Sequence, residues 1–160
     1  ITIPLATTED IEPGVSLSIA QQEIFTGTFD SFEFEDWANF ANVRMSNVLV
    51  GAPMSILQIV CVDYRTDSCA QYISGSGGGV LTRLRKGKYV NGSYQENEYS
   101  APVRHKPYLI TSWMSVMTQH IWTGLQAGDQ LQFDHQLKND THPGQTGLRN
   151  AKHIIIGLRA

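Results

Sequence analysis

Residues 125–133 of this 160-residue chain read LQAGDQLQF, and residues 153–158 near its end read HIIIGL. Gly128 and Asp129 form a turn signal, and after them Leu131 and Phe133 alternate with glutamines. Alternation with a period of two predicts a half-buried β-strand, because successive side chains of a strand point to opposite faces. We therefore predict a tight turn that leads into the last two strands of an all-β protein.

The same period of two recurs along the chain, with glycine, proline or asparagine between most of the alternating stretches. Short strands of this kind predict a two-sheet antiparallel β-sandwich with a jelly-roll or related Greek-key topology. The aromatic residues at 34, 37 and 40 recur every three residues, so residues 34–40 form either a short helix or an irregular loop. The predicted strands are residues 15–19, 23–34 with an interruption at Gly27, 43–50, 57–62, 80–84, 109–117, 131–137 and 152–159.

Length and composition predict one folded domain over residues 1–160, in which residues 1–14 form an extended N-terminal arm. Hydrophobic residues make up 41% of the chain and charged residues 17%, which is typical of a folded protein with a weakly charged surface. The formal net charge of -3 provides no overall attraction to nucleic acid or to anionic lipid. No apolar stretch approaches the roughly 20 residues of a membrane-spanning helix. We therefore expect neither a nucleic-acid partner nor membrane insertion.

The cysteines and two sequons indicate an extracellular protein. Cys61 and Cys69 enclose a turn-like segment, so they form either a disulfide that staples a hairpin or two free thiols. Asn91-Gly92-Ser93 and Asn139-Asp140-Thr141 are glycosylation sequons in polar segments. Together with the missing initiator methionine, these features predict a secreted glycoprotein with a Cys61–Cys69 disulfide and glycans on Asn91 and Asn139.

The turn Gly128-Asp129-Gln130 and the strand after it resemble the Gly-Asp-Gln turn before a late strand in C1q and tumour-necrosis-factor-like domains. The apolar stretch at residues 154–158 follows at about the distance found in that family, so the resemblance covers mainly residues 121–160. Residues 53–59 lack the aromatic pair of the family's Gly-x-Tyr-x-Phe strand. The resemblance implies a ten-stranded jelly roll that assembles as a homotrimer, binds protein or polyanion ligands on exposed loops and has no catalytic activity.

No catalytic, metal or cofactor motif is present. The glycines at residues 75–79 lack the lysine and following helix of a phosphate-binding loop, and no Gly-x-Ser-x-Gly elbow occurs. Asp134 and His135 are adjacent in a predicted strand, so they should face opposite sides and not act together. The alternative is an enzyme whose acid and base meet only in space, drawn from the histidines and from the carboxylates Glu33, Glu35, Asp63, Asp129 and Asp134.

A basic run and nearby tyrosines are the candidate ligand-binding residues. In a strand Arg83 and Arg85 share a face, and such a patch binds sulfated glycan, sialic acid or acidic protein, unless it is a solvated strand edge that discourages aggregation. The acidic segment at residues 23–36 is a possible partner for this run on a neighbouring subunit. Tyr94 and Tyr99 lie in a segment expected to be a polar loop, where exposed rings favour sugar binding or subunit contact. The predicted ligand-binding residues are Arg83, Arg85, Lys86, Lys88, Tyr94 and Tyr99.

These observations predict a secreted or surface-exposed module that forms oligomers, with a trimer favoured, and that binds a protein or glycan without catalysis. Three alternatives remain at this point. The first is a carbohydrate-binding lectin or the receptor-binding head of a viral or phage fibre. The second is a structural assembly subunit, and the third is an enzyme of unknown reaction.

Overall fold

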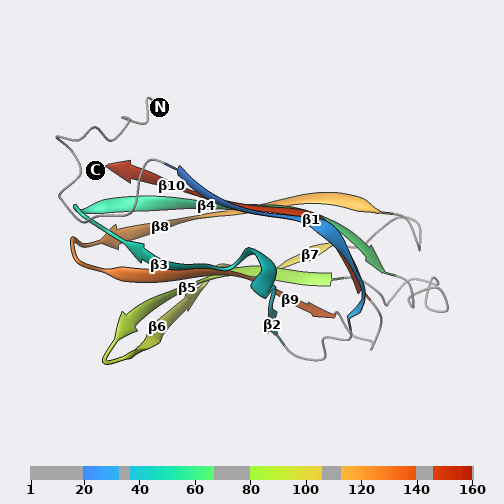
Figure 1. The fold of residues 1–160 in the computed structure, drawn as a ribbon, viewed down its shortest axis with the longest axis horizontal. Helices are drawn as coiled ribbons and strands as arrows, with labels where there is room; N and C mark the ends of the chain where they lie inside the picture. The colour runs from blue at the N-terminus through green and yellow to red at the C-terminus, as the bar shows by residue number, and fades with distance from the viewer. Residues whose placement is uncertain (1–19, 33–36, 67–79, 106–112, 140–145, 160) are drawn as a thin grey trace.

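The computed structural model describes residues 20–32, 37–66, 80–105, 113–139 and 146–159. They form two antiparallel sheets that face each other (Figure 1). Sheet A has the order β1 (Ala20–Phe32), β10 (Thr146–Arg159), β4 (Met54–Thr66) and β8 (Met114–Leu125). Sheet B has the order β2 (Ala38–Asn39), β9 (Gln130–Asn139), β5 (Val80–Val90) and β6 (Ser93–Tyr99). In addition, β3 (Met45–Leu49) pairs with β9, and β7 (Val103–His105) pairs with β5.

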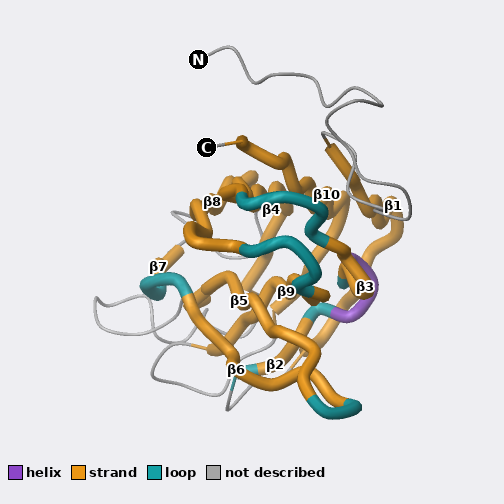
Figure 2. Tube along the Cα trace, turned by 90° about the vertical axis from the view of Figure 1, so that its left-hand side faces the viewer, coloured by secondary structure: helices purple, strands orange, loops and turns teal. Residues whose placement is uncertain are grey.

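The connections between the strands define a jelly roll. The chain passes between the sheets from β1 to β2, from β3 to β4, from β4 to β5, and at each step from β7 to β10. Neighbours in sheet A are therefore distant in sequence, and Figure 2 shows β8, β4, β10 and β1 side by side in one layer. The described residues contain ten strands in two sheets, which confirms the predicted sandwich and the jelly roll implied by the resemblance.

Alternation along β9 builds the core. Leu131, Phe133 and Leu137 are fully buried between the sheets, as the pattern predicted. The preceding turn also forms where it was predicted: Gly128 has a φ of 92°, and its backbone N–H donates to the carbonyl of Val50 at 2.7 Å. The Asp129 side chain accepts from the backbone N–H of Gln126 at 2.9 Å, which closes the turn.

Three predicted segments differ from the structure. Residues 37–40 do not form a helix: Ala38 and Asn39 pair with β9, and the short 3-10 helix η1 follows at Ala41–Val43. The strand predicted at 109–117 begins at Met114 in the described residues and continues to Leu125. The expected loop at Tyr94–Tyr99 is the strand β6, which follows a hairpin turn at Asn91 and Gly92 with φ values of 51° and 89°. The predicted strand at 15–19 lies outside the described residues.

Only some of the residues that predicted secretion lie among the described residues. Cys61 has a free thiol and Cys69 lies outside the described residues, so the structure does not contain the predicted disulfide. Asn91 is exposed in the β5–β6 hairpin turn, and Asn139 is the last residue of β9. In the part of the chain that the structure describes, no helix has the length and apolar character needed to cross a membrane.

Candidate functional site

The basic run on β5 is divided between two faces of sheet B. Arg83 and Arg85 share the outer face, as predicted. Lys86 points to the inner side of sheet B. Its ammonium lies 5.7 Å from the centre of the buried Trp122 ring on sheet A. Lys88, two residues further, lies on the same side as Lys86. Therefore the four basic residues do not form one patch.

Asp134 organises the outer face of sheet B. Its carboxylate is fully buried and accepts hydrogen bonds from Arg85 and from Nε of Arg44, the latter at 2.6 Å. Arg85 also donates to Oδ1 of Asn97 at 2.6 Å and to Oε1 of Gln132 at 3.1 Å. The guanidinium of Arg85 is thus fixed by neutral and charged partners within the same chain. The acidic segment at residues 23–36 of a neighbouring subunit, which was predicted as a partner, is not needed to balance the charge of Arg85.

Arg83 and Tyr99 form a stacked unit beside this cluster. The Arg83 guanidinium lies 4.2 Å from the ring centre of Trp37 and 3.8 Å from that of Tyr99. Its Nε donates to Oε1 of Gln136 at 2.7 Å. Tyr94 does not belong to this unit. Its hydroxyl accepts a hydrogen bond from the backbone N–H of Asn47 and donates one to Oδ1 of the same residue, both at 2.9 Å. The six predicted residues therefore lie in three places, namely the outer face of sheet B, its inner side and the strand next to the hairpin turn.

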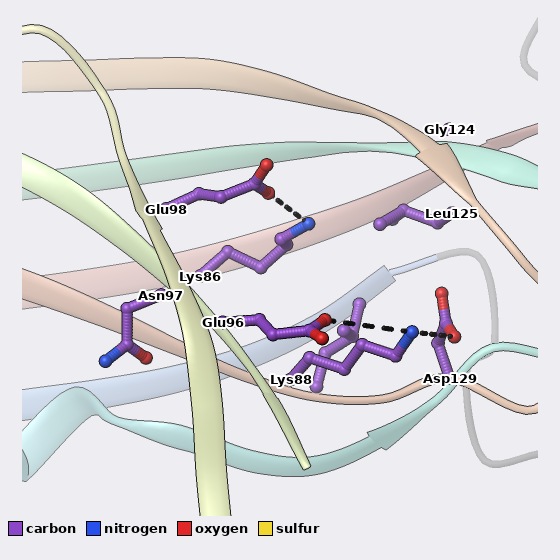
Figure 3. A pocket seen from close by; sticks show the side chains of 9 residues that line it. Lys86, Lys88, Glu96, Asn97, Glu98, Gly124, Leu125 and Asp129 are labelled. Carbon is purple, nitrogen blue, oxygen red and sulfur yellow. Dashed lines mark ion pairs between the residues drawn. The ribbon is translucent and has the colours of Figure 1, made fainter. Parts of the chain in front are cut away.

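Lys86 and Lys88 line a groove on the open side of the sandwich, between the edge strands β6 and β8 (Figure 3). We call it the edge groove. One part has a volume of about 290 Å³, and an adjoining part of about 470 Å³ shares Asn97 and Glu98 with it. The first part is lined by Lys86, Lys88, Glu96, Asn97, Glu98, Gly124, Leu125, Asp129 and Leu131, and the second by Asn97, Glu98, Tyr99, His120, Ile121, Trp122 and Thr123.

Ion pairs cross the charged part of the edge groove. Lys86 pairs with Glu98, and the Lys88 ammonium lies 3.2 Å from Asp129 and 4.0 Å from Glu96. Figure 3 shows Lys88 between these two carboxylates. The sequence analysis did not assign Glu96 to a site, and it considered His120 only among the histidines of the alternative enzyme. Their positions depend on the approach of β6 to β8, which are far apart in sequence and belong to different sheets.

Buried polar side chains link the two sheets in the interior. Tyr64 on β4 and His135 on β9 are hydrogen-bonded at 2.8 Å, and Tyr64 stacks on His105 with ring centres 5.6 Å apart. Burial lowers the pKa of His135 to about 3, and the neighbouring His153 and His105 act in the same direction. Burial also raises the pKa of the Tyr64 hydroxyl well above its usual range. These groups remain neutral and enclosed, so they do not resemble an accessible acid and base.

Asp134 and His135 face opposite sides of sheet B, as predicted. The carboxylate of Asp134 bonds arginines on the outer face, whereas the ring of His135 meets Tyr64 between the sheets. Within the described ranges, no three His, Cys, Asp or Glu side chains are grouped to hold a metal ion.

The outer face of sheet A is largely apolar, in contrast to that of sheet B. The ladder places Leu57 between Ile121 and Ile156, and Ile59 between Ile154 and the exposed Gln119. Met117 is 60% exposed and Ile121 51% exposed. We call this surface the apolar face; its members are Leu57, Ile59, Cys61, Met117, Ile121, Ile154, Ile156 and Leu158. An outward-facing sheet normally carries polar residues at such positions, so this surface departs from the usual pattern.

No protein-family model matches the chain, and no curated protein matches it in sequence. Solved structures share its fold. The structure of infectious bursal disease virus Gx strain is 8% identical with a TM-score of 0.51, and covers 93% of this chain and 36% of its own. The D431N mutant of VP2 from the same virus, in T=1 particles, is 11% identical with a TM-score of 0.50, and covers 91% of this chain and 35% of its own. This chain therefore spans about a third of those viral chains. Eiger TNF from S. frugiperda is 14% identical with a TM-score of 0.45, and covers 88% of this chain and 94% of its own.

Proposed function

We propose that this chain is a self-assembling subunit that associates with copies of itself through the apolar face of sheet A. The observation that carries the proposal is the exposure of Met117 and Ile121 on a face that also includes Ile154 and Ile156. Burial of apolar surface is the main driving force of subunit association. Among described residues, the charged side chains next to this face are Lys152, paired in register with Cys61, and the ion pair of Asp63 with Arg149 at one end. The centre of the face therefore has little charge to desolvate.

The composition of the surface also favours copies of the same chain. A face made of similar aliphatic side chains can pack against the same kind of face on a second copy, whether the interface is isologous or heterologous. A stable interface buries roughly 800 Å² on each partner, which is the scale of a four-stranded sheet face. The resemblance to C1q and tumour-necrosis-factor-like domains favours a trimer, and the viral particle proteins that share the fold favour a larger closed shell. Both are assemblies of one subunit type, and they are distinguished by mass.

The test is the native mass by light scattering over a range of protein concentrations. We expect the wild type to have a mass that is a multiple of 17.8 kDa. The double variant Met117→Glu and Ile121→Glu should be monomeric and still folded by circular dichroism, because the new carboxylates stay hydrated only in the free subunit. Gln95→Glu is the matched control, since it adds a charge to the exposed strand β6 away from the apolar face. A wild type that remains at 17.8 kDa contradicts the proposal.

We further propose that the subunit acts outside the cytoplasm and carries a glycan on Asn91. Asn91 is exposed at a hairpin turn that projects from sheet B, as Figure 1 shows, so a glycan there is compatible with the fold. Expression in a secreting eukaryotic cell should give a mass increase that a glycosidase removes and that Asn91→Gln reduces by the mass of one glycan. The Cys61–Cys69 disulfide and the glycan on Asn139 stay predictions, tested by the same mass measurement with and without reductant.

A further inference from the structure

We propose that the edge groove binds a neutral glycan chain. The observations that point to it are the two adjoining cavities, an unusual backbone at Glu96 and two lysines that are each paired with carboxylates. The proposal needs no second copy, because β5, β6, β8, β9 and the turn at Asp129 of one chain supply the lining residues, although Ile121 is shared with the apolar face. Of the predicted ligand-binding residues it uses Lys86, Lys88 and Tyr99, and it leaves out Arg83, Arg85 and Tyr94, which do not line the groove.

A bulge in β6 forms one wall of the groove. The register passes from Lys86 opposite Glu98 to Lys88 opposite Gln95, so Glu96 and Asn97 together face Gly87. Bulges are typical of strands that re-aim a side chain toward a site. Here Glu96 turns toward Lys88 and Asp129 in the groove, while Asn97 bonds Arg85 at 2.6 Å.

The bulge holds Glu96 in a strained conformation. Its φ is 49°, and the other non-glycine residues with positive φ among the described residues are asparagines, which tolerate this region far better. Such conformations are concentrated at functional sites. Glu96 is exposed, so the bulge and not core packing sets its conformation.

The charges of the groove favour hydroxyl groups over ionic ligands. Lys86 and Lys88 are each paired with a carboxylate, and Glu98 remains 60% exposed at its side chain. A ligand anion near Lys88 would be repelled by Asp129 and Glu96, and a cation would be repelled by Lys88 itself. A hydroxyl group can accept from an ammonium and donate to the neighbouring carboxylate at the same time. A chain of neutral sugars supplies such hydroxyls along its length.

The second part of the groove supplies surface for the apolar faces of sugar rings. Tyr99, which is 45% exposed, and the half-buried His120 line it, and His120 packs edge to face on the buried Trp122 with ring centres 4.4 Å apart. Aromatic rings with a few fixed polar groups are the usual lining of a small-molecule site. The volumes of the two parts, about 290 and 470 Å³, lie within the range of ligand pockets and extend along the side of the sandwich.

The test is a glycan microarray of neutral, sialylated and sulfated oligosaccharides probed with the glycosidase-treated wild type. The neutral oligosaccharide with the strongest signal on the array is then titrated by calorimetry into the wild type and into the variants Glu98→Gln and His120→Ala. We expect binding to neutral chains and at least tenfold weaker binding in each variant. Asp63→Asn is the matched control: it breaks an exposed ion pair with Arg149 outside the groove and should bind like the wild type. Circular dichroism and native mass, measured on all variants, establish that fold and assembly are unchanged.

Three results would overturn the proposal. One is an array without any bound neutral glycan. Another is neutral-glycan binding that neither groove variant weakens, since the site would then lie elsewhere. The third is binding limited to sialylated or sulfated glycans and lost in Arg83→Gln, which would assign recognition to the outer face of sheet B. None of these results bears on self-assembly, which is judged by mass alone.

Discussion

Gln58 and His153 are joined by a hydrogen bond of 2.9 Å that is compatible only with a neutral imidazole. Nδ1 of His153 lies 2.7 Å from the carbonyl of Val43 and therefore carries the proton, which leaves Nε2 as an acceptor for the Gln58 amide. The second amide hydrogen of Gln58 reaches the carbonyl of Asp134, and its oxygen accepts from Nε1 of Trp122 at 2.8 Å. A proton added to Nε2 of His153 would face a donor, and rotating the amide would leave Trp122 without its acceptor.

Acid should destabilise the protein between pH 6.5 and pH 5. Burial lowers the pKa of His153, partly opposed by Val43 and Asp134, and burial lowers the pKa of His135 to about 3. The unfolded chain therefore binds more protons below about pH 6.5, and stability falls with pH from there. His135 alone should cost about 2 kcal/mol at pH 5. Urea unfolding at several pH values measures this loss. The variant His135→Phe should reduce the slope of the free energy of unfolding against pH, even if it lowers that free energy at every pH. A free energy of unfolding that stays flat from pH 7 to pH 5 would contradict the prediction.

Asp63 should contribute to acid sensitivity only at lower pH. Burial alone would raise the pKa of its carboxyl, but hydrogen bonds from Ser115, Arg149 and Asn150 outweigh burial and lower it. The stability it adds is present above its ordinary value of 3.8 and is lost as the pH falls below that value. Asp63→Asn should leave the change between pH 6.5 and pH 5 as it is in the wild type, which unfolding at both pH values checks.

Gln58→Met should destabilise the fold although the two side chains are similar in size. The substitution leaves Nε1 of Trp122 and Nε2 of His153 without partners in a fully buried position. Each unsatisfied buried group costs about 1 to 3 kcal/mol, so we expect a loss of roughly 2 to 4 kcal/mol in the free energy of unfolding. Equilibrium urea unfolding at pH 7.5 gives the value, and a loss below about 1 kcal/mol would show that the network adds little.

Asp134→Ala should be more damaging than Asp63→Asn, although both break an ion pair with arginine. Asp134 is fully buried between Arg44 and Arg85, so its removal leaves two positive charges close together with their balancing carboxylate gone. We expect a loss of about 3 to 5 kcal/mol for Asp134→Ala and no more than about 1 kcal/mol for the exposed pair. Thermal and urea unfolding of both variants provide the comparison, and equal losses would contradict it.

Gly87→Ala should break the contact between Arg85 and Asn97. A Cβ atom at residue 87 would lie 2.9 Å from Nη2 of Arg85 and 2.9 Å from Oδ1 of Asn97, which are themselves hydrogen-bonded. These atoms belong to side chains that can shift, so we expect a loss of about 1 to 2 kcal/mol, typical of a disrupted hydrogen bond to a charged group. Unfolding measurements on Gly87→Ala and on Asn97→Ala should give similar losses. A fully stable Gly87→Ala protein would mean that the bond is not maintained in solution.

Most of the fold could be predicted because alternation reports burial directly. Leu131, Phe133 and Leu137 are inward-facing where the pattern placed them, and Gly128 forms the predicted turn. The strand β6 was missed because all but Tyr94 of its residues are exposed, so its sequence carries no apolar period. Its strand structure comes from pairing with β5 across a turn at Asn91 and Gly92, both in the left-handed conformation that such a hairpin requires.

The site could be predicted only in part, because sequence gives the face of a residue and not its neighbours in space. That Arg83 and Arg85 share a face followed from strand geometry and is confirmed. That Arg85 is held by Asp134 required knowing that β5 pairs with β9, some fifty residues away, in the register that sets these two residues opposite each other. The apolar face was equally hidden, since Leu57 and Ile59 on β4 look like core residues until the buried Ile56, Gln58 and Val60 show which side faces inward.

The satisfied hydrogen bonds of Arg85, Gln132 and Asp134 on sheet B also limit how an assembly grows. A sandwich with two adhesive faces adds copies to both sides and extends as a stack. Here the exposed Met117 and Ile121 lie on sheet A, whereas sheet B carries the arginine and carboxylate cluster. If subunits associate through sheet A as proposed, growth would end once those surfaces are covered, and sheet B would face the solvent. The same arginine and carboxylate cluster that stabilises one subunit would thus give the finished particle a defined outside.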